Sequence, residues 1–180
     1  SHGIKHCRGF PSIHITKGFI MIKRICEEHI PECVRVIRSS FLTVAHALGF
    51  TPENAPRFTA FATTEDRLKY QMFVEKKPMF AYFDGDVIAG YYSLALNDAN
   101  ECELNNLCVL PGYRHKGIGA ALLDHAFQTA KDLQCQKMNI GIVEENKVLR
   151  AWYESFGFIH RGTKKFDHFP FTCGYLDKML

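Results

Sequence analysis

The sequence lacks the long apolar run that a membrane-spanning helix requires. None of its apolar stretches approaches the roughly 18 residues of such a helix. The N-terminus also has no apolar segment of the kind found in secretion signals. The sequence therefore predicts a protein that has no membrane partner and works in the cytoplasm.

Paired cysteines are absent too. The seven cysteines are odd in number and include no C-x-x-C pair, which argues against a disulfide framework and against a zinc ribbon. We expect most of them to be small buried residues in a reducing compartment. The histidines and the cysteine near the N-terminus have no recognised ligand spacing, so no metal is predicted. The cysteines are Cys7, Cys26, Cys33, Cys102, Cys108, Cys135 and Cys173.

Acidic residues are missing from the first part of the chain. Residues 1–20 contain three basic side chains and no acidic one, and they begin with Ser-His. We interpret them as a vector-derived or upstream leader, with Met21 as the natural start and one domain over residues 21–180. The chain has 22 basic and 19 acidic residues, so without the leader the count is 19 against 19. This balance predicts no nucleic-acid partner.

The most informative stretch that is present runs from Leu104 to Leu123, LNNLCVLPGYRHKGIGAALL. A buried strand ends before Pro111-Gly112, and from Ile118 apolar residues recur about every four positions, as on one face of a helix. The first N–H groups of a helix have no internal partner and carry partial positive charge. Gly117 and Gly119 allow a ligand close to this backbone. The three residues before them are basic: Arg114, His115 and Lys116. We predict that this helix start binds a pyrophosphate.

Three glycine-rich phosphate motifs compete for this stretch. A P-loop would need Lys and Ser/Thr where Ile118 and Gly119 stand. A dinucleotide fingerprint would need a third glycine where Leu122 stands, so that match is weak. The third pattern, Arg-x-x-Gly-x-Gly, is met in full from Arg114 to Gly119. With it the chain resembles the GNAT superfamily, the acyl-CoA-dependent N-acyltransferases.

A second motif strengthens the resemblance. Asn146, then Tyr153 seven residues later, then Gly157-Phe158 follow the spacing of a segment in GNAT enzymes. Leu149 departs from the family pattern, in which a small alanine is commoner. The resemblance covers about Met21 to Leu180.

The pattern of elements predicts an α/β protein of the α+β type. We expect a mixed, mostly antiparallel central sheet of about six to seven strands with flanking helices, which is the GNAT fold. Asp84-Gly85 predicts a hairpin turn, whereas the strands 102–110 and 137–143 must be parallel because a helix crosses between them. The predicted strands are 22–26, 79–83, 87–96, 102–110, 137–143, 158–163 and 172–176, and the predicted helices begin near residues 30, 64, 118 and 144.

The resemblance implies roles for individual residues. A backbone N–H near Leu107 would stabilise the oxyanion, in a strand splayed from its parallel neighbour so that pantetheine can bond to the chain. Tyr153 would be the general acid, although a core aromatic is the alternative interpretation of that residue. The implied cofactor contacts are Leu107, Cys108, Val109, Arg114, His115, Lys116, Gly117, Ile118, Gly119 and Asn146.

Amide formation needs a free amine, and only about one alkylamine in 2,500 is unprotonated at pH 7. A carboxylate that takes the proton offsets this handicap. Glu103 lies 11 residues before Arg114, where several family members carry a general base. Other members carry an acid where this chain has Asn105, so a solvent-exposed Glu103 with a water chain as the base remains an alternative.

Together these features predict an N-acetyltransferase that moves an acetyl group from acetyl-CoA to a primary amine by direct attack in a ternary complex. The acceptor is not specified by the sequence: a protein N-terminus, a lysine, a polyamine, an amino acid or an amine antibiotic would all fit. Two other classes stay open, an acyl-CoA-binding module without turnover and a nucleotide-phosphate-binding protein. The oligomeric state is a monomer or a homodimer.

Overall fold

The computed structural model describes residues 20–180, so the predicted leader lies outside the described residues except for Ile20. The strands are β1 (Ile20–Arg24), β2 (Met79–Asp84), β3 (Val87–Leu96), β4 (Glu101–Val109), β5 (Lys137–Val143), β6 (Ile159–Lys165) and β7 (Thr172–Met179). The α-helices are α1 (Ile30–Leu48), α2 (Thr59–Ala62), α3 (Glu65–Phe73), α4 (Ile118–Asp132) and α5 (Lys147–Ser155). Two short 3-10 helices are η1 (Glu27–His29) and η2 (Pro111–Tyr113).

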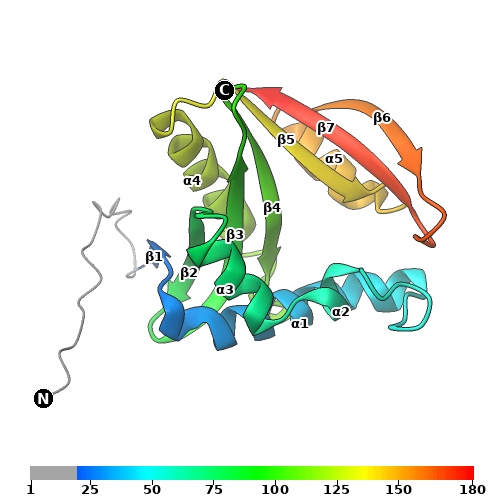
Figure 1. Cartoon of the computed structure of the whole chain (residues 1–180), viewed down its shortest axis with the longest axis horizontal. Coiled ribbons are helices and arrows are strands. Elements are labelled where there is room, and N and C mark those ends of the chain that lie inside the picture. The colour runs from blue at the N-terminus through cyan, green and yellow to red at the C-terminus, as the bar shows by residue number, and fades with distance from the viewer. Residues whose placement is uncertain (1–19) are drawn as a thin grey trace, which may run out of the picture.

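All seven strands join one sheet in the order β1-β2-β3-β4-β5-β7-β6. Every neighbouring pair is antiparallel except β4 and β5, which are parallel. Figure 1 shows β1 to β4 as one half of this sheet and β5 to β7 as the other half. The mixed, mostly antiparallel sheet predicted from the sequence is therefore confirmed.

Local signals in the sequence explain where α1 begins and ends. Pro31 lies in its first turn, where a missing N–H costs nothing, and Gly49 caps its end in the left-handed conformation at φ 71°. The next long helix, α3, begins after Thr64, whose side chain accepts a hydrogen bond from the Arg67 backbone N–H.

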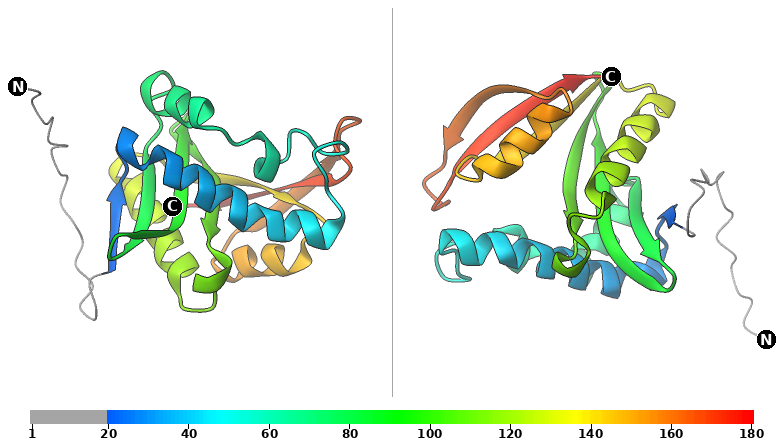
Figure 2. Two further views of the ribbon diagram at one scale, coloured as in Figure 1. Left: turned by 90° about the horizontal axis from the view of Figure 1, so that it is seen from below. Right: turned by 180° about the vertical axis from the view of Figure 1, so that it is seen from behind.

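Helices cover both faces of the sheet, and each face has its own apolar core. On one face, α1 and α3 pack through Ile30, Ile37 and Leu68 against Tyr91 and neighbouring residues of β2 and β3. On the other face, the buried side of α4 packs on β3 and β4 together with residues of α5. The rear view in Figure 2 shows α4 and α5 side by side on that second face.

Most predicted boundaries differ from the observed ones by one to three residues, and one helix was not predicted. The first strand begins at Ile20 and not at Ile22, because Ile20 pairs with Asp84 of β2. The short helix α2 lies in a stretch for which we predicted no element, and four residues are too few to show a helical period. Within residues 20–180, no helix is both long and apolar enough to cross a membrane.

Candidate functional site

A wedge opens where β4 and β5 separate. The two strands pair only at Glu101–Lys137, Cys102–Met138 and Glu103–Asn139. Beyond that point they diverge, as Figure 1 shows between the two halves of the sheet. The splayed strand that the family resemblance implied is therefore present in the structure.

A β-bulge adds to this opening on the β4 side. Ser93 of β3 pairs with Asn105, but Tyr91, two residues away, pairs with Cys108, three residues away. Asn106 occupies the left-handed region at φ 53°, a conformation that Asn tolerates better than most residues. Asn106 and Leu107 consequently have no partner residue in β3 or in β5. Both residues border the wedge at this point of β4.

The wedge holds a cleft of about 280 Å³. Three of the predicted site residues line it: Leu107, Asn146 and Tyr153. Most of the other walls are apolar and come from α1, the segment before α2, β5 and the segment between β6 and β7. They include Phe41, Val44, Phe58, Leu104, Ile140, Ile142, Val143, Leu149, Phe169 and Phe171.

The N-terminus of α4 lies at the end of β4 and is uncapped by any side chain. Its N-cap residue is Gly117 at φ 80°, and a Cβ there would meet nothing within 4 Å. Gly119 is closely approached, because a Cβ on it would lie 3.5 Å from the ring of Trp152. Gly117 therefore borders open space, and the uncapped N–H groups of this first turn form the kind of site that binds anions.

Arg114 does not point into this open space. Its Nε donates to the Val109 carbonyl oxygen at 3.2 Å, and its two terminal nitrogens donate to Thr43 Oγ1 at 3.0 Å and to the Ser40 carbonyl oxygen at 2.9 Å. The side chain therefore ties α1 to the end of β4 and fixes the turn that precedes α4. Its predicted contact with the cofactor stays a prediction.

Three other predicted cofactor contacts lie in two different settings, at the surface and in the core. His115 and Lys116 are exposed, and Lys116 Nζ lies 5.2 Å from the centre of the Tyr113 ring. The Cys108 thiol is buried on the α1 face of the sheet, where burial raises its pKa to about 12. A thiol of that kind is inert at neutral pH, and the predicted contact of Cys108 with the cofactor stays a prediction.

Glu103, the predicted base, is an exposed residue at the last position where β4 pairs with β5. Asn105 Nδ2 donates to its Oε1 at 2.9 Å, and Lys77 Nζ donates to Asn105 Oδ1 at 3.3 Å. Partial burial, together with the nearby Cys173 and Glu103, raises the pKa of Tyr175, a residue of the cleft wall. Glu103 therefore lies beside the rim of the cleft and is not part of its lining.

Tyr153, the predicted acid, is 6% exposed and lines the cleft from α5. Its ring packs edge-on against Trp152 and Phe158 with centroids 4.9 and 5.4 Å away. Burial raises the pKa of its phenol, so the hydroxyl stays protonated at neutral pH. Tyr153 is therefore both a core aromatic and a residue of the cleft lining.

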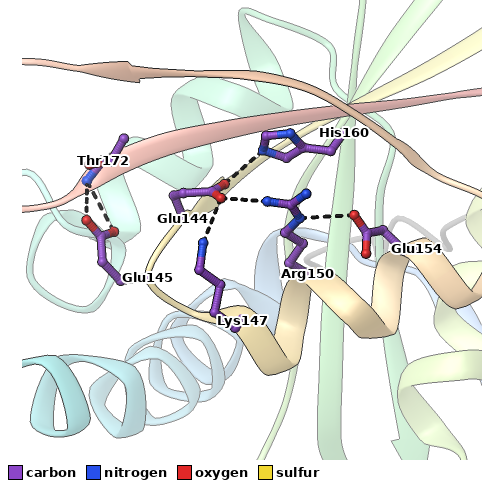
Figure 3. A network of polar contacts seen from close by, with 7 residues as sticks. All are labelled: Glu144, Glu145, Lys147, Arg150, Glu154, His160 and Thr172. Carbon is purple, nitrogen blue, oxygen red and sulfur yellow. Dashed lines mark hydrogen bonds and ion pairs between the residues drawn. The ribbon is translucent and has the colours of Figure 1, made fainter.

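A network of charged side chains fixes the turn between β5 and α5 (Figure 3). Asn146 is the N-cap of α5, and Tyr153 lies within that helix. Glu144 accepts from Lys147 at 2.8 Å and from Arg150 at 2.7 Å, and His160 Nε2 lies 2.9 Å from its other oxygen. Partial burial alone would raise the pKa of Glu144, but these partners outweigh it and lower the pKa to about 2. The carboxylate therefore stays ionised at neutral pH, with its charge balanced by neighbouring side chains.

Two further contacts hold this turn. The Glu145 carboxylate accepts a hydrogen bond from the Thr172 backbone N–H at 2.9 Å, which joins the turn to β7. Asn146 caps α5 by accepting from the Leu149 backbone N–H at 3.2 Å. A Cβ on Gly174 would overlap the Glu144 carboxylate, so a larger residue at that position would have to displace the Glu144 side chain.

The sequence analysis missed the residues that close the cleft on its far side. Arg57, Phe58, Phe169 and Phe171 lie in two loops that are far apart in sequence. The density of phenylalanine in those loops was a signal, but it did not reveal that the loops meet. The Asn105-Asn106 pair inside an apolar strand could likewise have indicated the bulge. Among the residues that the structure describes, no group of three or more His, Cys, Asp or Glu side chains is placed to hold a metal ion.

Comparison with known proteins identifies similar chains. A protein from Lactobacillus delbrueckii subsp. lactis, described as an uncharacterised N-acetyltransferase in the pepI 3' region, is 26% identical over 167 residues, which are 86% of this chain and 90% of that protein. The ribosomal protein bS18-alanine N-acetyltransferase of Escherichia coli K12 is 30% identical over 81 residues, which are 45% of this chain and 54% of that protein.

Solved structures share the fold. The PaiA N-acetyltransferase of Thermoplasma acidophilum, in complex with coenzyme A, has a TM-score of 0.76 at 20% identity and covers 89% of this chain and 99% of its own. The Escherichia coli ribosomal-protein-S18-alanine N-acetyltransferase has a TM-score of 0.70 at 15% identity, covering 88% and 92%. The model of the acetyltransferase (GNAT) family matches residues 47–158, more than half of the sequence. The chain belongs to this family of acyltransferase enzymes.

Proposed function

We propose that this protein transfers the acetyl group of acetyl-CoA to a primary amine by direct attack within a ternary complex. One observation carries the proposal: Asn106 and Leu107, which have no partner residue in either neighbouring strand, and the uncapped N-terminus of α4 lie at the same end of β4. A ligand with an anionic head and a narrow hydrogen-bonding arm matches both features. Acetyl-CoA is such a ligand.

The pyrophosphate is assigned to the first turn of α4. Free N–H groups and the helix dipole attract it there, the exposed Lys116 side chain adds positive charge, and the exposed His115 lies beside it. The pantetheine arm then runs along the backbone of Cys108 and Val109 into the wedge. The thioester would lie near Leu107, whose N–H stabilises the oxyanion.

The amine attacks the thioester carbon, which forms the C–N bond and leaves the carbonyl oxygen as an oxyanion. Glu103 accepts the amine proton, directly or through water, because an amine with a pKa near 10.4 arrives mostly protonated. Collapse of the intermediate breaks the C–S bond. Tyr153, protonated at neutral pH because it is buried, donates to the departing thiolate.

The test is a thiol-release assay with acetyl-CoA against a broad panel of amines that includes peptides. Turnover should require both acetyl-CoA and an amine, and the acetylated amine should form in equal amount to the thiol. Binding of CoA without thiol release from any amine would favour an acyl-CoA-binding module. Tighter binding of ATP or NAD than of CoA would favour a nucleotide-phosphate-binding protein.

A further inference from the structure

We propose that the acceptor is a primary amine with an apolar, preferably aromatic, body and a carboxylate at its far end, and that Arg57 binds this carboxylate. The proposal rests on the proposed function, since it names the substrate class of the same cleft. Three observations support it: the positive charge of the cleft, its aromatic walls, and the anchored backbone beside Arg57.

The charge of the cleft has one sign. Arg57 is the one charged residue among those described that line the cleft, and no aspartate or glutamate lines it. Arg57 is exposed, and within residues 20–180 its guanidinium has no hydrogen bond or ion pair. This differs from Arg150 and Arg161, whose side chains are held by Glu144 and Asp177. A guanidinium without a partner in a ligand cleft suits a carboxylate, which it can bind through two parallel hydrogen bonds.

The walls beside Arg57 are aromatic. Phe58 lies 5.9 Å from Phe171 between ring centroids, and Phe169 stacks on Phe171 at 4.8 Å. These contacts join the segment before α2 to the segment between β6 and β7, and both views of Figure 2 show these segments near each other. Such a wall favours a flat or apolar body in the acceptor.

Arg57 is held at a fixed place on this wall. The next residue, Phe58, is 5% exposed, and its backbone N–H donates to the Ala55 carbonyl oxygen at 2.9 Å. The Phe58 ring also packs against Phe50 with centroids 5.1 Å apart. The backbone from which the Arg57 side chain extends is therefore anchored, although the side chain itself is exposed.

The same features argue against a polyamine or another polycationic acceptor. A second ammonium group would need an acidic partner, and the described lining of the cleft offers none. It would instead meet the positive charge of Arg57. Like charges at close range repel, and the repulsion grows where the cleft excludes water.

The experiment uses three amines with the same aromatic body and different far ends: para-(aminomethyl)benzoate, benzylamine and para-xylylenediamine. The wild-type protein should prefer them in that order by kcat/KM, with the carboxylate about fivefold or more above the neutral amine, the scale of one partly exposed ion pair. In Arg57→Gln the ratio of carboxylate to neutral amine should fall toward one. In Arg57→Glu the diamine should become the best of the three.

Arg24→Gln is the matched control. It removes the same charge from β1, at the edge of the sheet opposite to β6, and should leave all ratios as in the wild type. A wild-type preference for the diamine, or an unchanged carboxylate ratio in Arg57→Gln, would overturn the proposal. So would a loss of CoA affinity in Arg57→Gln with no change in the ratio, because Arg57 would then serve the cofactor.

Binding separates this proposal from the proposed function. Calorimetry of the three amines with the CoA complex needs no turnover, and the same order of affinity is expected. If no amine releases thiol but the carboxylate binds best in the wild type and not in Arg57→Gln, the assignment of the carboxylate site stands and the proposed transfer is wrong. If amines are acetylated without any preference for the carboxylate, the transfer stands and this proposal is wrong.

Discussion

The turns that follow β4 and β5 differ in whether their charged side chains have partners within the protein. After β5, the charge of Glu144 is balanced by Lys147 and Arg150, and His160 adds a further contact, so the carboxylate has its partners within the protein. After β4, His115 and Lys116 are exposed beside an uncapped helix, and neither has an acidic partner among the described residues. The turn after β5 holds the shape of the wedge, whereas the turn after β4 is open to an anion.

The same contrast separates two glutamates of the wedge. Glu144 has two cationic partners and a histidine beside it, whereas Glu103 accepts a hydrogen bond from Asn105 and forms no ion pair within residues 20–180. A charge that is satisfied internally contributes to stability, and one without a counter-charge is free to exchange a proton with a ligand. Mutations at the two sites should therefore affect different properties.

The largest effect is expected at Glu103. Glu103→Gln removes a proton acceptor but keeps the size of the side chain, so turnover should fall about 10²- to 10⁴-fold near neutral pH. The defect should shrink as pH rises, because more of the amine then arrives deprotonated. The rate of thiol release against pH, with one confirmed acceptor, is the measurement.

Glu101→Gln provides the control for this prediction. Glu101 lies on the same strand two residues earlier, but Lys137 and Asn139 hold its carboxylate at 2.6 and 2.9 Å. It should retain most of the wild-type turnover. A pH profile of Glu103→Gln that runs parallel to the wild type would contradict the role of Glu103 and indicate a water chain or another acid.

A smaller loss is expected in Tyr153→Phe. The substitution removes the donor to the departing thiolate, but a CoA thiolate is a fair leaving group because the reference thiol pKa is near 8.5. Turnover should fall about tenfold, CoA affinity should change little since one neutral hydrogen bond contributes about 1 kcal/mol, and raising the pH should not rescue the rate. Tyr70→Phe on the surface of α3 is the control, and full rescue at high pH would contradict the role of Tyr153.

The smallest effect concerns stability and not turnover. In Glu144→Gln the melting temperature at neutral pH should fall by a few degrees, since about 1 kcal/mol corresponds to roughly 2–4 °C in a chain of this size. The pKa of Glu144 is lowered from its ordinary value of 4.5 to about 2 in the folded protein. Its contribution is therefore complete above about pH 4.5 and is lost as the pH falls toward 2.

Urea unfolding of wild type and Glu144→Gln between neutral and acidic pH measures this dependence. The difference in the free energy of unfolding should narrow as the pH drops. A difference that stays constant with pH would show that the network of Glu144 does not depend on its charge.

Local rules predicted most of the fold. Pro31, Gly49 and Asp84-Gly85 mark element ends whose backbone requirements can be read from the residues themselves, and the crossing helix α4 makes β4 and β5 parallel. The position of the first strand was two residues late because its start is decided by pairing with β2. Pairing partners are tertiary information that a local pattern does not contain.

The parts of the site that lie in one continuous stretch of sequence were predictable, whereas the parts built from distant segments were not. The loop from Arg114 to Gly119 is one continuous stretch whose glycines can be read directly from the sequence, although His115 also adopts the left-handed conformation at φ 60°. The direction of the Arg114 side chain depends on Ser40 and Thr43 of α1, which are distant in sequence. The aromatic wall with Arg57 depends on the meeting of two loops, so only the folded chain reveals it.

The most direct test of the contrast between the two turns is calorimetric titration of CoA into wild type, Gly117→Glu and Gly85→Glu. Both glycines have a left-handed backbone, at φ 80° and φ 59°, and a Cβ on either would meet nothing within 4 Å. The two substitutions therefore impose similar strain, but only the first puts a negative charge at the start of α4. We expect Gly117→Glu to weaken CoA binding by tenfold or more while Gly85→Glu binds like the wild type; equal affinity of the two folded variants would contradict the assignment of the open turn as the pyrophosphate site.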